Sequence, residues 1–369
     1  SSTVLLYYGN NFLPDAPALG FSLMGWYWFH SYWQVRGSIK QLALAFLFFS
    51  LAALLRITFF LHPLAALLAV FGSGLHARQP IGYLMRKHLK LLAAFGLSAL
   101  TVAAWVLYMR WYNAANHDSY FLTHARPIWE MAPSAVREVW DYILNYWHNK
   151  FYYPSTWHFF LGALIAGSLV LPLVRLTPWT HAVLYVLVGS LAFALLFFEQ
   201  FRDHDYYFIT LIPAIAFLTV HSFLLLRQKF PRIFGHWSVK AGLAFLCLLS
   251  LNYAREKLDE RYRLGGADPF SKVGTLLAGA RATLDDLAIP ETARFVMLND
   301  PTPNGGLYFI DRRGWSVPDV DARSLHLLEN YRAHGATYII LLGKPIPEVM
   351  QYVELISEEQ GYSIYRFRK

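Results

Sequence analysis

The chain has 369 residues, of which 56% are hydrophobic and only 15% are charged. Soluble globular proteins carry about a quarter charged residues, so this composition excludes an ordinary soluble protein over the whole length. The net charge of +8 is compatible with nucleic-acid binding. In a membrane protein, however, it follows from basic cytoplasmic loops, and we expect no nucleic-acid partner. A single cysteine, Cys247, excludes an intrachain disulfide and a cysteine-based metal site.

Apolar residues are concentrated in residues 1–253, which we predict to be a multi-spanning α-helical membrane domain. A helix needs about 20 mostly apolar residues to cross a bilayer. The eight predicted spans cover 17–33, 40–56, 58–75, 89–109, 158–175, 180–198, 207–226 and 237–253. The second and third form either two spans with a tight reversal around Arg56 and His62 or one broken helix. Residues 1–8 resemble the end of a span, so we expect a further segment before them.

Basic residues between the spans predict the orientation. With the spans above, four basic loops fall on one side of the membrane, and they contain Arg36 and Lys40; Arg78, Arg86, Lys87 and Lys90; Arg175; and Arg227, Lys229, Arg232 and Lys240. Lys and Arg are enriched in cytoplasmic loops, so this side is predicted to be the cytoplasm. The region around Asp15, the loop 110–157, the segment 199–206 and residues 254–369 then share the opposite, outward side.

The outward loop 110–157 is rich in tryptophan and tyrosine. Within it, Val136, Val139, Trp140, Ile143 and Trp147 recur at helical spacing, with polar residues between them. This pattern predicts an amphipathic helix that lies on the membrane surface. An aromatic belt without a chemical role is the alternative.

Residues 254–369 have the composition of a small soluble α/β domain. The patterns predict helices over 269–287, 321–334 and 347–359 and strands over 294–299, 307–310, 337–342 and 362–367. The domain has no Gly-x-Gly-x-x-Gly and no Walker-type loop, so we do not expect it to bind a nucleotide. The segment Asn299–Gly306 is typical of a Pro/Gly/Asn turn; a ligand loop at the carboxyl end of a strand is the alternative.

A dense group of ionisable residues lies between the predicted spans 180–198 and 207–226. A charge at the bilayer centre costs about 2.5–3.5 kcal/mol, so such groups must lie at the interface or in a hydrated cavity. Either the segment binds a phosphorylated lipid, with Arg202 and His204 on the phosphate oxygens, or it is a solvated loop that ends two helices. Short loops seldom need five charges, which favours a binding site. The candidate residues are Arg202, Asp203, His204, Asp205, Tyr206 and Tyr207, preceded by Glu199.

Two further candidates lie at predicted helix ends. Asp15, in NNFLPDAP, is followed by a proline in the first helical turn, as is typical of a helix cap. The alternative is an acid that binds a metal or a sugar hydroxyl. Arg56 either pairs with a phosphate or extends toward the interface. The scattered histidines show no metal-site spacing.

Three stretches are similar to a known family of membrane enzymes: YYGNNFLPDAPALGF, FRDHDYYFITLIPAIAF and NDPTPNGGLYFIDRRGW. The first is similar to an outward loop that ends in an acid before a span, and the third to an outward domain of some members. The second, the most specific, is similar to a His-x-Tyr-Tyr…Pro segment, here His204, Tyr206, Tyr207 and Pro213. Through nearly its whole length the chain thus resembles the bacterial branch of the dolichyl-phosphate-mannose–protein mannosyltransferase-like family, of glycosyltransferase family 39 type with the GT-C fold.

The resemblance implies transfer of a sugar from polyprenyl phosphate to a hydroxyl of a glycolipid, polysaccharide or protein, among the lipids of a bacterial cytoplasmic membrane. A carboxylate would act as general base. Cationic groups, sometimes helped by Mg or Mn, would stabilise the leaving phosphate. By position, Asp15 corresponds to the family's second-loop acid and His204 to a phosphate contact, and relatives often carry Lys where Arg56 stands. The family's main catalytic acid would precede residue 1, so the resemblance implies that this chain alone is inactive.

Two other functions remain open from the sequence. A transporter or flippase for a lipid-linked glycan would place ionisable groups inside spans and break helices at mid-membrane. A non-catalytic membrane assembly protein would expose an apolar patch on the C-terminal domain. The charges of this chain gather at span ends, which favours an enzyme that works at the membrane surface.

Overall fold

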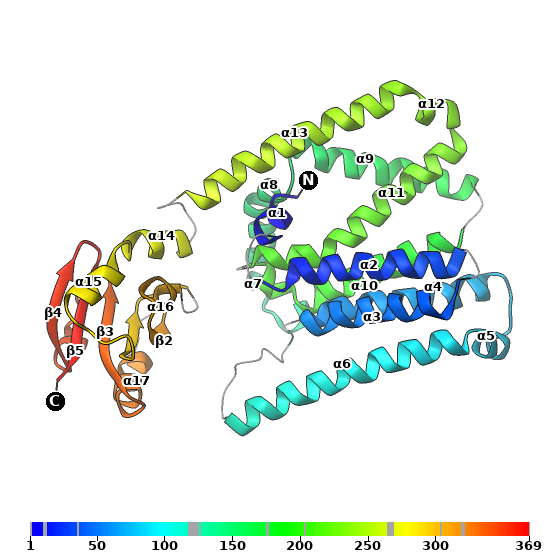
Figure 1. Ribbon diagram of the computed structural model, residues 1–369. Coiled ribbons are helices and arrows are strands. Elements are labelled where there is room, and N and C mark those ends of the chain that lie inside the picture. Colours follow the sequence, from blue (N-terminus) through cyan, green and yellow to red (C-terminus); the bar gives the residue numbers. More distant parts are fainter. Residues whose placement is uncertain are drawn as a thin grey trace. The chain divides into compact units, whose positions relative to one another are not determined.

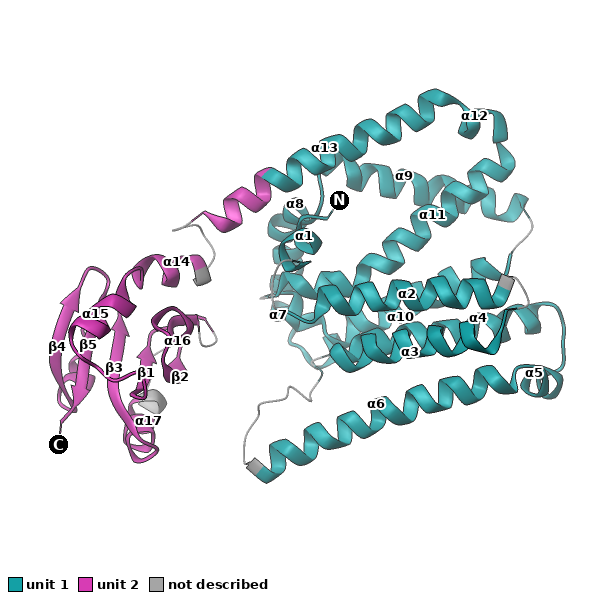
Figure 2. Ribbon diagram, viewed as in Figure 1, with its two compact units in different colours: residues 1–255 teal, residues 256–369 magenta. Residues whose placement is uncertain are grey.

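The computed structural model describes residues 2–9, 13–34, 37–116, 125, 127–174, 177–202, 204–263, 269–302, 305–318 and 322–368. The chain forms two compact units, Ser1–Arg255 and Glu256–Lys369 (Figure 2). The first unit is helical, and the second contains a five-stranded sheet (Figure 1).

The helical unit is built from long helices joined by short helical segments. The long helices are α2 (Asp15–Gln34), α3 (Ile39–Leu55), α4 (Leu61–His76), α6 (Leu89–Asn116), α9 (Pro154–Val170), α10 (Pro178–Leu196), α11 (Ile212–Lys229) and α13 (Trp237–Tyr262). The short ones are α1 (Thr3–Gly9), α5 (Ile81–Lys87), α7 (Pro133–Tyr142), α8 (His148–Phe151) and α12 (Pro231–Gly235). A 3₁₀ segment, η1 (Ile57–Phe60), separates α3 from α4.

Six helical stretches in the described part of the chain are long and apolar enough to cross a membrane. They cover 57–76, 89–115, 154–173, 178–196, 205–229 and 237–262, and each overlaps a predicted span. These helices indicate a membrane protein. The other two predicted spans form α2 and α3; α3 is apolar but has 17 residues, and α2 is not among the six. The count of eight spans therefore stays a prediction.

Helices α2, α3, α4 and α10 share a core in which large aromatic rings pack against small residues. Trp26, Phe29 and Phe49 are buried there beside the alanines of α3 and α4. A Cβ atom on Gly25 would lie 2.4 Å from the Phe49 ring, so the absence of a side chain lets α2 and α3 approach closely. Close helix contact through small residues is the usual packing mode in membranes, where no hydrophobic effect drives helices together.

The second unit is a sheet with helices on both faces. Its strands are β1 (Arg294–Leu298), β2 (Arg313–Val317), β3 (Ala336–Leu342), β4 (Val353–Glu359) and β5 (Tyr362–Phe367), in the order β2-β1-β3-β5-β4. Strands β2, β1 and β3 are parallel, whereas β5 is antiparallel to both β3 and β4. One face packs on α14 (Pro269–Leu276), α15 (Ala280–Asp286) and α16 (Gly305–Ile310), the other on α17 (Ala322–Ala333) and α18 (Pro347–Met350).

Three sequence predictions for this unit were wrong in detail. The predicted strand 307–310 is helix α16, because Asp300 accepts a hydrogen bond from the amide of Gly306 and so caps a helix start. The predicted helix 347–359 ends at Met350, and 353–359 is edge strand β4, which pairs with β5 across a turn that uses Gly361 at φ +101°. The predicted helix 269–287 is divided at Gly279, which has φ +86°. Strand β2 was not predicted.

The described part of the aromatic segment between α6 and α9 is mostly helical. Helix α7 continues through a π-helical segment, η3 (Ile143–Trp147), into α8. Val139 of α7 is buried against Phe198 and Phe201 of the 3₁₀ segment η5 (Phe198–Phe201). The predicted amphipathic segment therefore packs on the ionisable segment that was predicted to form the site.

Candidate functional site

Asp15 and Arg56 form an ion pair at the ends of two helices. Asp15 is the first residue of α2, and Arg56 follows the last residue of α3. Arg56 Nε lies 3.0 Å from Asp15 Oδ1, and 1% of the Asp15 side chain is exposed, against 25% for Arg56. The pair lacks hydrogen-bond geometry, and neither Asp15 carboxylate oxygen has a hydrogen-bond partner within the described residues. Buried polar groups are normally satisfied, so this carboxylate has more acceptor capacity than a structural cap requires.

The Arg56 guanidinium also lies against two tyrosines of the ionisable segment. Its Cζ atom is 4.6 Å from the ring centroid of Tyr207 and 5.4 Å from that of Tyr206. Both tyrosines belong to the 3₁₀ segment η6 (Asp205–Leu211). His204, directly before η6, stacks on the two rings with centroid separations of 5.1 Å to Tyr206 and 6.0 Å to Tyr207. Asp15, Arg56, His204, Tyr206 and Tyr207, from three stretches of sequence, thus form one group, which we call the α2–η6 cluster.

Tyr8 and Asp205 extend this cluster. The Tyr8 hydroxyl donates a hydrogen bond of 2.6 Å to Asp205 Oδ1, and the Tyr8 ring meets the Tyr206 ring edge-on at 5.6 Å. Helix α1, which carries Tyr8, contacts η6 directly. The sequence patterns did not single out Tyr8, although it lies in the stretch YYGNN that precedes Asp15. Its only signal was a position close to a candidate acid.

Burial raises the pKa of Asp15 above its ordinary value, and the positive charge of Arg56 acts in the opposite direction. Desolvation is the larger effect, since the carboxylate is almost completely removed from water while Arg56 is partly exposed. A carboxyl group whose pKa is raised toward neutrality is better suited to accept and release a proton than an ordinary aspartate is.

An apolar cavity of about 200 Å³ adjoins the cluster. Asp205 lies at its wall, and the other lining residues are almost all apolar: Trp140, Ile143, Trp147, His148, Phe151, Trp157, Ala194, Phe198, Phe201, Phe208 and Leu211. The indole of Trp147 donates a hydrogen bond of 2.7 Å to the carbonyl oxygen of Phe201, which holds η3 against η5. An apolar space beside a polar cluster suits an amphiphilic ligand.

Two other predicted site residues lie in the same segment. Arg202 follows η5 and is half-buried. Asp203 lies outside the described residues. Across the residues that the structure describes, no three His, Cys, Asp or Glu side chains are grouped as a metal ion would require. No metal ligand is therefore assigned among these residues, and no step below involves a metal.

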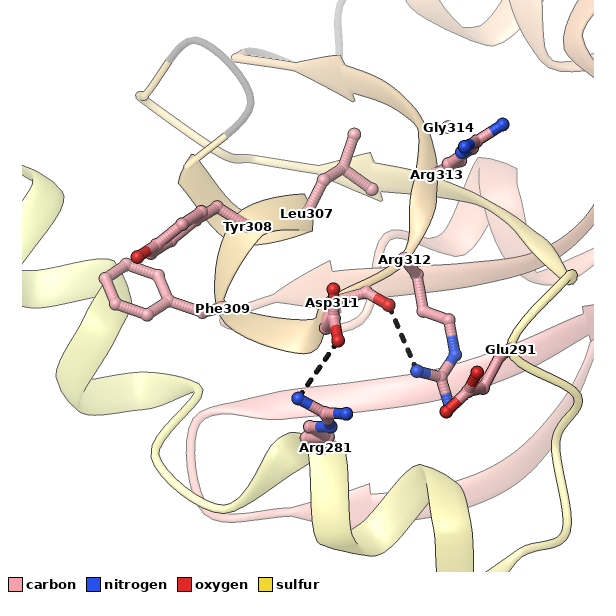
Figure 3. A pocket seen from close by; sticks show the side chains of 9 residues that line it. All are labelled: Arg281, Glu291, Leu307, Tyr308, Phe309, Asp311, Arg312, Arg313 and Gly314. Atoms are coloured by element: carbon pink, nitrogen blue, oxygen red, sulfur yellow. Dashed lines mark hydrogen bonds and ion pairs between the residues drawn. The ribbon is translucent and has the colours of Figure 1, made fainter. Parts of the chain in front are cut away.

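The second unit contains a separate concavity of about 920 Å³ (Figure 3). It is lined by Arg281, Glu291, Leu307, Tyr308, Phe309, Asp311, Arg312, Arg313 and Gly314. Arg281 points toward Asp311, with 3.0 Å between Nη1 and Oδ2 (Figure 3), and Arg312 Nη2 lies 3.0 Å from Asp285 Oδ1. Two of its three arginines are thus already paired with acids.

The turn after β1 is held together by Asp300, which is fully buried. Its Oδ1 accepts hydrogen bonds from the amide and hydroxyl of Thr302, at 2.9 and 2.6 Å. Its Oδ2 accepts from the amide of Gly306 at 2.9 Å and from the Ser316 hydroxyl at 3.1 Å. All of its acceptor capacity is used by the fold, which favours the turn interpretation of this segment over a ligand loop.

No protein-family model matches the sequence, and no curated protein is significantly similar to it. The family resemblance therefore rests on the three quoted stretches, and any function assigned to the chain rests on the chemistry of the α2–η6 cluster.

Proposed function

We propose that the α2–η6 cluster binds the phosphate of a polyprenyl-phosphate-linked sugar, and that the protein transfers this sugar to an acceptor hydroxyl at the outer face of a cytoplasmic membrane. The supporting observation is the contact of the Asp15–Arg56 ion pair with the tyrosines of η6 beside His204. An acid, a cation and an imidazole meet at the ends of apolar helices, where a lipid head group would be handled.

The cations suit the phosphate. A guanidinium has five N–H donors and matches phosphate oxygens with two parallel hydrogen bonds. Arg56 keeps a quarter of its side chain exposed, and the tyrosine rings hold its plane in place. Arg56 and His204 would then stabilise the negative charge that grows on the phosphate as the sugar leaves, which is the usual source of the largest rate enhancement.

The acid suits the hydroxyl chemistry. In the transfer, the acceptor oxygen bonds to the anomeric carbon while the bond from that carbon to the phosphate oxygen breaks, and the hydroxyl proton passes to a carboxylate. Asp15 has an unused acceptor oxygen and a raised pKa, so it would accept a hydrogen bond from a reacting hydroxyl. The apolar cavity beside Asp205 would take the first isoprene units of the carrier.

Donor binding and turnover in the full-length protein test this proposal. His204→Ala and Arg56→Gln should each weaken binding of polyprenyl phosphate by about tenfold or more, because each removes a charge-assisted hydrogen bond. His181→Ala is the matched control: His181 lies near the start of α10 with its ring centroid 5.5 Å from that of His76, outside the cluster. Unchanged donor affinity and unchanged transfer of labelled sugar in both cluster variants would rule the proposal out.

Sidedness gives an independent test, because the proposal needs the cluster and the C-terminal unit on one side. Single cysteines can be placed at His204, Lys344 and Lys87 after Cys247→Ser removes the only natural thiol. A membrane-impermeant thiol reagent should label positions 204 and 344 from outside, and position 87 only after permeabilisation. Labelling of 204 and 344 from opposite sides contradicts the proposal.

One observation keeps transport as a second candidate. His62 is completely buried in α4, where its Nδ1 accepts a hydrogen bond of 3.1 Å from the Trp26 indole and its Nε2 has no partner among the described residues. An ionisable side chain within a membrane span is a common sign of a transport pathway. Loss of lipid-linked glycan transport into proteoliposomes on His62→Ala, with sugar transfer absent in the unaltered protein, would favour this function.

A further inference from the structure

A second concavity of the C-terminal unit gathers four arginines. Its volume is about 540 Å³, and its lining includes Arg294, Arg332, Arg366 and Arg368. It lies at the edge of the sheet where β1 and β3 begin and β5 ends. Its described lining contains no aspartate or glutamate. We call it the arginine basin.

Among the residues that the structure describes, no carboxylate forms an ion pair with the arginine basin. Within the described chain, none of the four arginines is among the side chains that form an ion pair with a carboxylate. The acid nearest to them in strand register is Glu354, the cross-strand partner of Arg366, and even these two side chains form no ion pair. The concavity of Figure 3 is different, because Arg281 pairs with Asp311 there. Arg312, which also lines it, pairs with Asp285 of α15.

Neutral contacts hold three of the four side chains in position. Arg294 Nη1 donates to the carbonyl oxygen of His334 at 2.8 Å, and Arg368 Nε donates to that of Val353 at 2.9 Å. The Arg366 guanidinium lies over the Tyr338 ring, 5.6 Å from its centroid. Each guanidinium has five N–H donors, so these contacts orient the groups and leave most donors available.

Four guanidinium groups in one concavity, three of them oriented and none paired with a carboxylate of the described residues, favour an anion with several oxygens. Like charges held close together repel one another, and an anion between them relieves this repulsion. The planar fork of arginine matches phosphate in particular, through two parallel hydrogen bonds. A volume of about 540 Å³ is ample for a phosphate carried on a small polar head group.

The chain itself indicates where such a phosphate comes from. Residues 263–268 connect α13, a candidate membrane helix, to α14 of the sheet domain. Even fully extended, such a connection spans only about 20 Å. The domain is therefore tethered near a bilayer surface, where lipid phosphates are concentrated and each nearby arginine contributes about a fivefold gain in binding to anionic lipid. We propose that the arginine basin binds the phosphate of an anionic phospholipid head group.

The proposal is independent of sugar transfer and can be tested by binding alone. The full chain in neutral detergent would be titrated with short-chain phosphatidylglycerol below its micellar concentration, with phosphatidylcholine of the same chain length and with inorganic phosphate. Arg332→Gln combined with Arg366→Gln should weaken phosphatidylglycerol binding by roughly 25-fold, at about fivefold per charge. Unlike Arg294 and Arg368, these two side chains donate no hydrogen bond to a backbone carbonyl oxygen within the described residues, so the fold should be unaffected.

The other concavity provides the matched control. Arg281→Gln combined with Arg313→Gln removes the same charge from the same domain and should leave the affinity unchanged. Arg332→Lys with Arg366→Lys should bind with intermediate affinity, because the charge remains and the fork is lost. Equal affinity for inorganic phosphate and phosphatidylglycerol would overturn the assignment to lipid. Equal losses in the two glutamine double variants would overturn the site itself.

Discussion

Asp15 in the first unit and Asp300 in the second are both almost completely buried, but their carboxylates have different hydrogen-bond partners. Asp300 is fully buried and accepts four hydrogen bonds from Thr302, Gly306 and Ser316. Asp15 is 1% exposed, faces the Arg56 guanidinium at 3.0 Å and has no hydrogen-bond partner within the described chain. The Asp300 carboxylate therefore uses its acceptor capacity within the fold, whereas the Asp15 carboxylate can still accept hydrogen bonds from a ligand.

This difference separates a structural acid from a candidate functional one. A carboxylate that uses all its acceptor sites internally has nothing left to offer a ligand, and its removal exposes the donors it satisfied. A buried carboxylate without hydrogen-bond partners lowers the stability of the fold, and such unsatisfied ionisable groups are concentrated at functional sites. The comparison therefore predicts opposite consequences for activity and stability when each aspartate is replaced.

Replacement of Asp15 should give the largest effect on activity. Asp15→Asn keeps the size of the side chain but removes the negative charge that we propose accepts a hydrogen bond from the reacting hydroxyl, so sugar transfer should fall by about 10²- to 10⁴-fold. Polyprenyl-phosphate binding should change little, since the phosphate contacts are Arg56 and His204. Transfer from labelled donor and donor affinity, measured on the same preparation, check the prediction. Normal transfer by this variant would remove the contrast between the two aspartates.

Replacement of Asp300 should give the largest effect on stability. Asp300→Ala leaves the buried amides of Thr302 and Gly306 without acceptors, and each unsatisfied donor costs about 1–3 kcal/mol. Hydrogen exchange of β1, α16 and β2 should show the free energy of opening reduced by about 3 kcal/mol. Asp286→Ala, an exposed change on α15, is the control and should stay within about 0.5 kcal/mol. A small effect at Asp300 would mean that the turn has another support.

The helices of the membrane unit were predictable because the signal there is composition over a long window. Six predicted spans overlap long apolar helices, and the boundaries differ most where α6 and α13 continue past the predicted ends at residues 109 and 253. In the sheet domain the signals are short and ambiguous. The spacing of Val349, Val353 and Ile356 fits a helix, yet strand pairing across Gly361 makes 353–359 a strand, so tertiary contacts overrode the local pattern.

The candidate site was predictable as residues but not as an arrangement. Asp15, Arg56 and His204 were each singled out by charge near a helix end, which is a local property. Their convergence depends on how α2, α3 and η6 pack, and no sequence spacing encodes it. Tyr8 was missed for the same reason, because a tyrosine in an aromatic-rich chain carries no signal until its hydrogen bond to Asp205 is known.

A conservative change of Arg56, the ion-pair partner of Asp15, tests the α2–η6 cluster more finely. Arg56→Lys keeps the positive charge but loses the planar contact with the Tyr206 and Tyr207 rings and the two-pronged geometry for phosphate. Cation–π contacts of this kind contribute about 0.5–2 kcal/mol, so donor affinity should fall by about 2- to 30-fold. Equilibrium binding of polyprenyl phosphate measures it, with Arg86→Lys on α5 as an unaffected control.

The pH dependence of the transfer rate should depend on the protonation state of Asp15, and this is a smaller effect than those above. Burial raises its pKa above the ordinary 3.8, and Arg56 partly offsets the rise. Transfer needs the deprotonated carboxylate, so the rate should increase with pH through this raised pKa. Arg56→Gln removes the offset and should move the rise to higher pH, while Asp15→Asn should abolish it.

Stability should follow the same titration with the opposite sign. Because folding raises the pKa of Asp15, the protonated carboxyl contributes stability that is fully present below the unfolded pKa, near 3.8, and is lost as pH increases through the folded pKa. Arg56→Gln should widen the pH range over which this loss occurs, and Asp15→Asn should remove the loss. If Asp15→Asn changes neither the pH dependence of the transfer rate nor that of the free energy of unfolding, the Asp15 carboxylate has only a structural role, like that of Asp300.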